Sequence, residues 1–293
     1  MKQKKRINPA FYIMTVPMAV LFFCFHTFPF LQGVFYSFTD WKGYGNWNFV
    51  GLRNYLHIFQ DKNVGYSYLF TFKFAICATI LVNVLSLLLA CALNAKIGCK
   101  NFLKAVFFLP SVISLVVGSI LYTWILNPIS GPVAIVAGWF GLKLPFWSKT
   151  EGWVIAVLCI ITTWKTFGYN FINILAGVSG VSMEVIEAAR LENVPMWKIF
   201  KDIVVPMSSA TGIYVFITTI VQGLQYVFTP IKVVTQGGPN YASSNLIYMS
   251  YHEAFTLYKT GTSSAVSVMT MALFIILLVL EFRFVEKGVY YEN

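Results

Sequence analysis

The stretch SMEVIEAARLENVPMWKIFKDIVVP, residues 182–206, separates two long apolar runs and is itself amphipathic. Ser182 can cap a short helix, because its side-chain oxygen is suited to accept a hydrogen bond from a free N–H of the first turn. Glu184 and Glu187 follow in the early turns, where a negative charge is favoured by the helix dipole. The pattern predicts a helix that begins directly after Ser182.

The same stretch contains a stop signal and a second helix. Asn193 is suited to the left-handed conformation in which many helices end, and Pro195 prevents the helix from continuing. A second short helix is expected over residues 196–202, leading to Pro206 at the start of the next apolar run. Six apolar residues of this helix-turn-helix are expected to be exposed and to need covering, namely Val185, Ile186, Leu191, Val194, Met196 and Trp197.

The chain around this stretch has the composition of a membrane protein. Of its 293 residues, 58% are hydrophobic and only 11% are charged, whereas about a quarter are charged in an ordinary soluble domain. The mean hydropathy of +0.70 also excludes a disordered chain, which needs low hydrophobicity. The five cysteines lie mostly in apolar stretches without metal-binding spacing and are interpreted as small apolar side chains.

Runs without Asp, Glu, Lys or Arg predict an all-α fold of six transmembrane helices, since about 20 apolar residues cross a bilayer. The third run is too long for one helix, so it is interpreted as a span followed by a non-cytoplasmic re-entrant or surface segment. Residues 1–10 form a basic N-terminus and residues 11–293 a single transmembrane domain. The spans are expected near residues 11–36, 70–94, 104–126, 153–177, 206–230 and 260–283.

Basic residues in the loops predict that both termini are cytoplasmic, because Lys and Arg favour that side of the membrane. The segments then assigned to the cytoplasm hold Lys2, Lys4, Lys5, Arg6, Lys96, Lys100, Lys104, Arg190, Lys198, Lys201, Arg283 and Lys287. The longer outer loops hold Lys42, Arg53, Lys62, Lys143, Lys149, Lys232 and Lys259. A cleavable signal peptide is the alternative for the first run, which lacks a small-residue cleavage site.

Groups that carry chemistry are scarce in the predicted spans. All 11 carboxylates fall in loops or at span ends, which disfavours proton or sodium coupling through buried acids. No GxxxxGK[ST] loop, nucleophile–base pair or metal ligand set occurs, so neither catalysis nor a bound cofactor or metal is expected of this chain. His26 is interpreted as a polar group bonded to a neighbouring helix.

A charged residue, Lys165, lies deep in the fourth span, where it should face the bundle interior or water because a charge facing lipid is costly. It stands beside other polar and aromatic residues. Helix packing and a substrate pathway are both open interpretations of this group and of a second one in span five. The substrate-pathway candidates are Trp164, Lys165, Tyr169, Asn170, Asn173, Gln222, Gln225 and Tyr226.

Residues 187–206 resemble the EAA loop of binding-protein-dependent ABC importer permeases, whose pattern is EAA, three residues, G, nine residues and I-x-L-P. Asn193 stands in place of the glycine, and Val205 in place of the leucine. The resemblance implies that the glutamate matched by Glu187 contacts an ATPase subunit. The residues assigned to this loop are Glu187, Ala188, Ala189, Arg190, Asn193, Ile203 and Pro206.

The resemblance extends over nearly the whole chain to the carbohydrate-uptake branch of that family, which includes the maltose, glycerol-phosphate and multiple-sugar permeases. It is carried by SFTDW at 37–41, FVGLRNY at 49–55, TQGGPNYASSNLIYMSYHEAF at 235–255 and TGTSSA at 260–265, as in the first of the two permease subunits. It implies the ABC importer permease fold in a bacterial inner membrane. It also implies a second permease, two ATPases holding ATP and Mg²⁺, an extracellular binding protein and a sugar substrate.

Other functions remain as alternatives. A secondary transporter or channel would work without ATPases, and the scarcity of intramembrane carboxylates disfavours it. An ABC permease for amino acids, phosphate or a polyamine would keep the assembly and change the cargo. The net charge of +10 is explained by topology, so it does not indicate nucleic acid as a partner.

Overall fold

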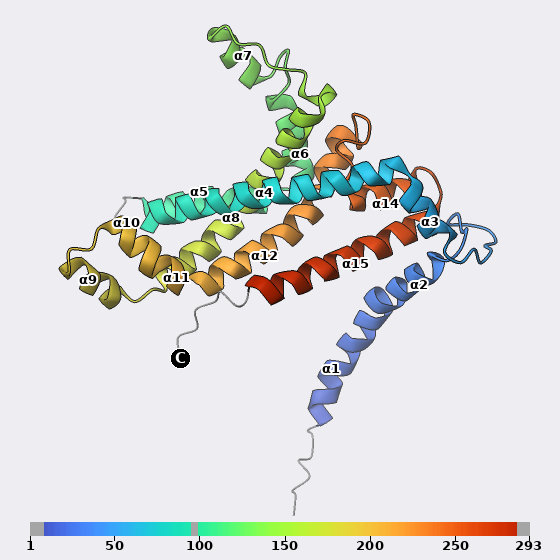
Figure 1. Ribbon diagram of the computed structural model, residues 1–293, viewed down its shortest axis with the longest axis horizontal. Coiled ribbons are helices and arrows are strands. Elements are labelled where there is room, and N and C mark those ends of the chain that lie inside the picture. The colour runs from blue at the N-terminus through green and yellow to red at the C-terminus, as the bar shows by residue number, and fades with distance from the viewer. Residues whose placement is uncertain (1–8, 95–98, 286–293) are drawn as a thin grey trace, which may run out of the picture. The chain divides into compact units, whose positions relative to one another are not determined.

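The computed structural model describes residues 9–94 and 99–285, and the regular structure in these ranges is helical (Figure 1). Extended backbone pairs only in a single bridge, between Thr39 and Phe49, within the described ranges. The predicted all-helical fold is therefore confirmed. The basic residues before residue 9, together with Lys96 and Lys287, lie outside the described residues.

The chain divides into two compact units, of which the first comprises residues up to 61 and residues 250–271. Its helical elements are α1 (Pro9–Phe22), the π-helical segment η1 (Phe23–Thr27), α2 (Phe28–Tyr36), α3 (Arg53–Gln60), the end of α14 (Leu246–Phe255) and the start of α15 (Thr260–Val285). The π-helical turn at η1 changes the hydrogen-bond pattern without ending the helix, so residues 13–36 form a continuous candidate span.

Hydrogen bonds to the backbone join the loop after α2 to the rest of the first unit. The side-chain Nδ2 of Asn54 donates to the carbonyl oxygens of Ser37 at 2.8 Å and Thr39 at 2.7 Å. The N–H of Gly261 donates to the carbonyl of Trp41 at 2.8 Å. A Cβ at position 261 would collide with the carbonyl of Thr39, so the start of α15 needs glycine there.

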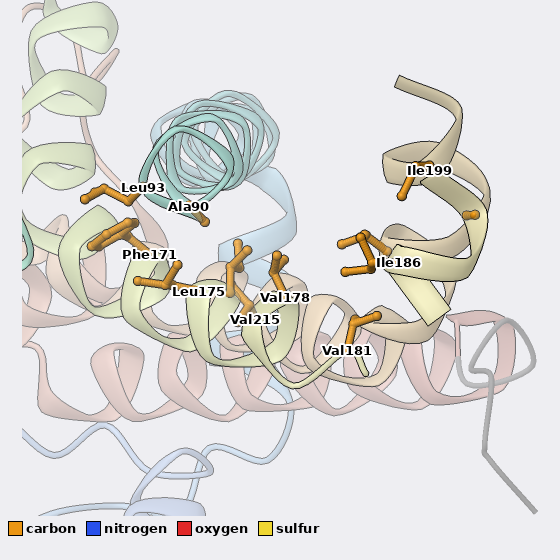
Figure 2. Packing of buried hydrophobic residues seen from close by; sticks show 12 residues of the cluster. Ala90, Leu93, Phe171, Leu175, Val178, Val181, Ile186, Ile199 and Val215 are labelled. Atoms are coloured by element: carbon orange, nitrogen blue, oxygen red, sulfur yellow. The ribbon is translucent and has the colours of Figure 1, made fainter. Parts of the chain in front are cut away.

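The second unit comprises residues 62–249 and those from 272 onward, and α8 is its centre. In its apolar window 56% of α8 is buried, against 33% for α4, because helices pack on several of its faces. Figure 2 shows part of this core, in which Ala90 and Leu93 of α4 lie near Phe171 of α8. The main packing elements are α4 (Lys62–Asn94), α5 (Lys100–Val112), α6 (Leu115–Ile125), α8 (Glu151–Ser179) and α12 (Ser209–Tyr226).

Residues 104–126, expected to form one span, contain two helices rather than one. α5 and α6 meet at 99°, and the two residues between them, Ile113 and Ser114, have extended backbone with ψ of 139° and 131°. Pro110 lies in the last turn of α5, where its missing N–H weakens the helix. Two helices form instead of one because the backbone is extended at these two residues. Hydropathy alone does not reveal such a break.

Five helices in the described ranges are long and apolar enough to cross a membrane, and the bent α5–α6 pair is a sixth span only if it crosses as one. Each overlaps a predicted span: Ile13–Tyr36, Lys62–Leu93, Glu151–Ser179, Ser209–Thr235 and Thr260–Leu280. Short elements complete the second unit: α7 (Pro132–Trp139), η2 (Trp147–Lys149), α13 (Phe228–Pro230) and the π-helical η4 (Ile231–Thr235).

Candidate functional site

The first half of the predicted helix-turn-helix is α9 (Met183–Leu191). Ser182 occupies the N-cap position, although its hydroxyl makes no capping hydrogen bond. Asn193 has the left-handed φ of +57°. The N–H of Asn193 donates to the carbonyl of Arg190 at 3.0 Å, and the N–H of Val194 to that of Ala189 at 3.1 Å. These two bonds form a Schellman motif, so the predicted end of the helix is confirmed.

The second half extends further than the prediction over 196–202. Three short helical elements follow Pro195 without a gap, and Pro206 lies inside the last of them, two residues before the turn at Ser208. The next span therefore begins at Ser209 rather than at Pro206. The elements are α10 (Met196–Ile199), the π-helical η3 (Phe200–Val204) and α11 (Val205–Met207). Residues 182–207 are called the α9–α11 segment below.

The two faces of α9 have different surroundings. Glu187, Ala188 and Arg190 are exposed, whereas Ile186 and Ala189 are buried. The expectation that Ile186 is exposed is wrong, because its side chain belongs to the apolar cluster that holds α9 on the end of α8 (Figure 2). One face of α9 is thus fixed by the chain itself, while the face that carries Glu187 is open.

Large apolar side chains are exposed next to this open face. Leu191 is 85% exposed, and Met196 and Trp197 are each 61% exposed. Val185 is exposed and Val194 half-buried. Met196 and Trp197 line a cavity of about 420 Å³ between α9, α10 and the end of α8. Exposed apolar side chains around a cavity in a packed segment are typical of a protein-protein contact surface.

Lys165 and Trp164 lie at the bend between α5 and α6. The Nζ of Lys165 donates to the carbonyl of Ser111 at 2.7 Å and to that of Ile113 at 2.6 Å. The Trp164 ring lies edge-on to Tyr122 of α6, with ring centroids 5.4 Å apart. These are the contacts expected of helix packing, and a role in a substrate pathway stays a prediction.

Asn170 is buried between two helices. Its Nδ2 donates to the hydroxyl oxygen of Thr219 at 2.8 Å, which joins α8 to α12. Its Oδ1 has no hydrogen-bond partner among the described residues. Asn173 donates to the carbonyl of Tyr169 at 3.0 Å. The structure leaves the remaining candidates more accessible, with Tyr169, Gln225 and Tyr226 exposed and Gln222 half-buried.

Two acidic groups in the first unit have shifted pKa values. The pKa of Asp40 is lowered because the backbone N–H of Asn48 donates to its carboxylate at 2.6 Å and the Asn48 side chain at 3.1 Å. Burial raises the pKa of Glu253 on α14. A cavity of about 350 Å³ in this unit is lined by Asp40, Trp41, Lys42, Arg53, Asn54, His57, Lys259, Gly261 and Thr262.

No family model matches the chain. Over 283 residues it is 30% identical to the sn-glycerol-3-phosphate transport system permease protein UgpA of Brucella abortus, and the alignment covers 96% of both chains. The chain belongs to the ABC importer permease family. This permease is therefore a transport subunit of the membrane rather than an enzyme, and its resemblance to the carbohydrate-uptake branch is confirmed.

Other relatives agree with this assignment. The permease is 28% identical over 264 residues to the probable starch degradation products transport system permease protein AmyD of Thermoanaerobacterium thermosulfurigenes, covering 88% of each chain. Its fold matches a chain of a bacterial ABC transporter involved in the import of the acidic polysaccharide alginate, with a TM-score of 0.86 and 17% identity. That alignment covers 95% of both chains. At this identity the structural match supports the fold alone.

Sequence reasoning did not identify the partners of the permease's buried polar groups. Thr219 and the carbonyls of Ser111 and Ile113 were not singled out, although they accept hydrogen bonds from Asn170 Nδ2 and Lys165. The available signal was the Pro110–Ser111 pair inside an apolar run, where a serine beside a proline indicates a disturbed helix.

Proposed function

We propose that this permease imports a sugar or an oligosaccharide by alternating access, driven by ATP hydrolysis in partner subunits. It pairs with a second permease above two ATPases that bind ATP and Mg²⁺, and an extracellular binding protein delivers the substrate. The permease lies in the cytoplasmic membrane of a bacterium. It crosses that membrane six times, with the bent α5–α6 pair as one span and both termini in the cytoplasm.

The observation that carries the proposal is the open face of α9. Glu187 is exposed there beside Leu191, whose side chain is 85% exposed, and close in sequence to Trp197. These residues belong to a segment whose other side is buried in the apolar cluster. A partner that covers this face gains apolar contact and an ionic anchor, and it acts on a part of the permease that is already fixed to the core.

The same arrangement supports the mechanical part of the proposal. The α9–α11 segment joins α8 to α12, and its inner residues pack with Val178 of α8 and Val215 of α12. A displacement of the segment is therefore applied to both helices. When ATP binding closes the two ATPases, the segment held between them tilts α8 and α12 and changes which side of the membrane is open.

The substrate class rests on the relatives. Their names specify sn-glycerol-3-phosphate and starch degradation products. Both carry several hydroxyl groups, so hydroxyl groups are the shared chemistry. Tyr169, Gln225 and Tyr226 are exposed, and the two tyrosine rings can stack on sugar rings while all three side chains can hydrogen-bond to hydroxyls. Lys165 and Asn170 already donate hydrogen bonds to other helices.

The proposal is tested by Glu187→Lys in the complex reconstituted into proteoliposomes with its copurified partners. Substrate-stimulated ATP hydrolysis and uptake are measured with a panel of labelled maltose, maltooligosaccharides and sn-glycerol-3-phosphate. We expect stimulation to be lost, by about tenfold or more, because the reversed charge removes the ionic anchor. The amount of permease in the membrane should not change, since Glu187 is exposed.

Glu192→Lys is the matched control, because it makes the same charge change at an exposed residue of the same helix end, at a position where the EAA pattern specifies no residue type. It should retain most of the stimulation. Full coupling in Glu187→Lys, or an equal loss in both variants, would contradict the assigned contact. Purification of the native permease without any ATPase would contradict the proposed function as a whole.

A further inference from the structure

The bend between α5 and α6 leaves backbone carbonyls that a straight helix would use. Because Ile113 and Ser114 are extended, the carbonyls at the end of α5 lose their partners four residues ahead. The bend lies in an apolar part of the chain, where an unpaired carbonyl is costly. The Nζ of Lys165 takes these carbonyls over, at 2.7 Å from Ser111, 2.6 Å from Ile113 and 3.5 Å from Pro110.

Residues on either side of Lys165 contact the two arms of the bend. Trp164 packs so closely on Gly118 of α6 that a Cβ there would lie 2.6 Å from the ring atom Cζ3. Gly168 lies against the backbone of α5, where a Cβ would collide with the carbonyl of Phe107. Two glycines, one on α6 and one on α8, therefore allow the close approach. About one turn of α8, residues 164–168, holds both arms of the bend with Lys165 between them.

α8 connects this contact to the α9–α11 segment. The helix runs unbroken from Glu151 to Ser179, and α9 begins four residues later at Met183. Ser179 lies 14 residues after Lys165, which corresponds to about 21 Å at 1.5 Å per residue. A continuous helix buried on several faces moves as one body, so a displacement at its α9 end reaches the bend.

We propose that Lys165 is a positioning residue that fixes the α5–α6 bend to α8, so that α6 and α8 move together when the α9–α11 segment is displaced. The transmission step rests on the proposed function, but the fixation does not. Three carbonyls occupy the donors of the ammonium, so Lys165 acts through the backbone of the bend rather than on the substrate. The contacts by which Lys165 packs the helices together are then also the contacts through which it acts.

The test compares Lys165→Met with Lys165→Arg in the assembled complex. Spin labels are attached at Leu121→Cys on α6 and Ala176→Cys on α8, both exposed, after the five native cysteines are replaced by alanine. Their distance distribution is measured without nucleotide and with MgATP and vanadate. Lys149→Met, which removes an exposed lysine before α8, is the matched control.

We expect one narrow distance in the native background, in Lys149→Met and in Lys165→Arg, whose guanidinium still donates to carbonyls. In Lys165→Met the distance distribution should be broad in both nucleotide states. MgATP hydrolysis should stay within about twofold of the native rate, because α9 is unchanged. A narrow native distance in assembled Lys165→Met, or loss of hydrolysis in parallel with lost assembly, would overturn the proposal. Failure of the proposed function shows separately, as no MgATP hydrolysis in the native complex.

Discussion

Two regions of this permease contain residues of unusual type for their position, and the chain treats them differently. In residues 164–170 of α8, the ammonium of Lys165 and the Nδ2 of Asn170 donate hydrogen bonds to neighbouring helices. In the α9–α11 segment, Leu191 and Trp197 are large apolar side chains left open. An unusual residue that its own chain satisfies holds the fold together, whereas one that the chain leaves unsatisfied indicates a partner.

The largest difference in stability between a residue buried by its own chain and one left open is expected within α9. Ile186→Ser removes an aliphatic side chain that is 9% exposed and buries a hydroxyl, so it should cost about 3 kcal/mol of stability. Leu191→Ser changes a side chain that is 85% exposed and should stay within about 0.5 kcal/mol. Thermal unfolding of the permease pair, expressed without its ATPase subunits, measures both.

The two variants should exchange their order when ATPase binding is measured. Leu191→Ser removes apolar contact from the open face and should reduce the amount of copurified ATPase by about tenfold. Each variant is the control for the other, because they lie on one helix and introduce the same residue. An unfolding temperature lowered equally in both would mean that Leu191 belongs to the core and that the open face is no contact surface.

A second prediction sharpens the comparison inside α8. Thr219→Val leaves the buried Nδ2 of Asn170 without its acceptor and should cost about 1–3 kcal/mol. The double variant Asn170→Leu with Thr219→Val removes both partners and should recover most of that loss, because no polar group stays unpaired. Thermal unfolding and uptake are measured together. Restored stability without restored uptake would assign Asn170 to the substrate pathway after all.

The sequence predicted the spans and the helix-turn-helix because their causes are local. Whether an apolar run can cross a bilayer depends on its own length. The end of α9 at Asn193, followed by Pro195, depends only on a few neighbouring residues. Apolar run lengths and turn residues therefore predict those structural features that depend on residues close in sequence.

The features that the sequence did not predict depend on residues far apart. Ile186 was expected to be exposed, but α8 supplies the apolar cluster that buries it. The 99° bend between α5 and α6 is stabilised by Lys165, more than 50 residues further along. A hydropathy window around Ile186 does not include the α8 residues that bury it, and a window around the bend does not include Lys165. Hydropathy therefore cannot distinguish a straight span from a bent one whose carbonyls bond to a distant ammonium.

The smallest effect concerns the turn that sets how α9 presents its open face. Asn193 has a φ of +57°, which a β-branched residue adopts only at a cost of about 1–2 kcal/mol. Asn193→Val should therefore lower the unfolding temperature, while Asn193→Gly should leave it within the equivalent of a few tenths of a kcal/mol, because glycine has no Cβ. Glycine is also the residue that the EAA pattern has there.

Because the turn directs the α9 face rather than the α8 contacts, Asn193→Val should reduce ATPase copurification and leave the α6–α8 spin distance unchanged. A valine variant as stable as native would mean that the left-handed turn does not end α9.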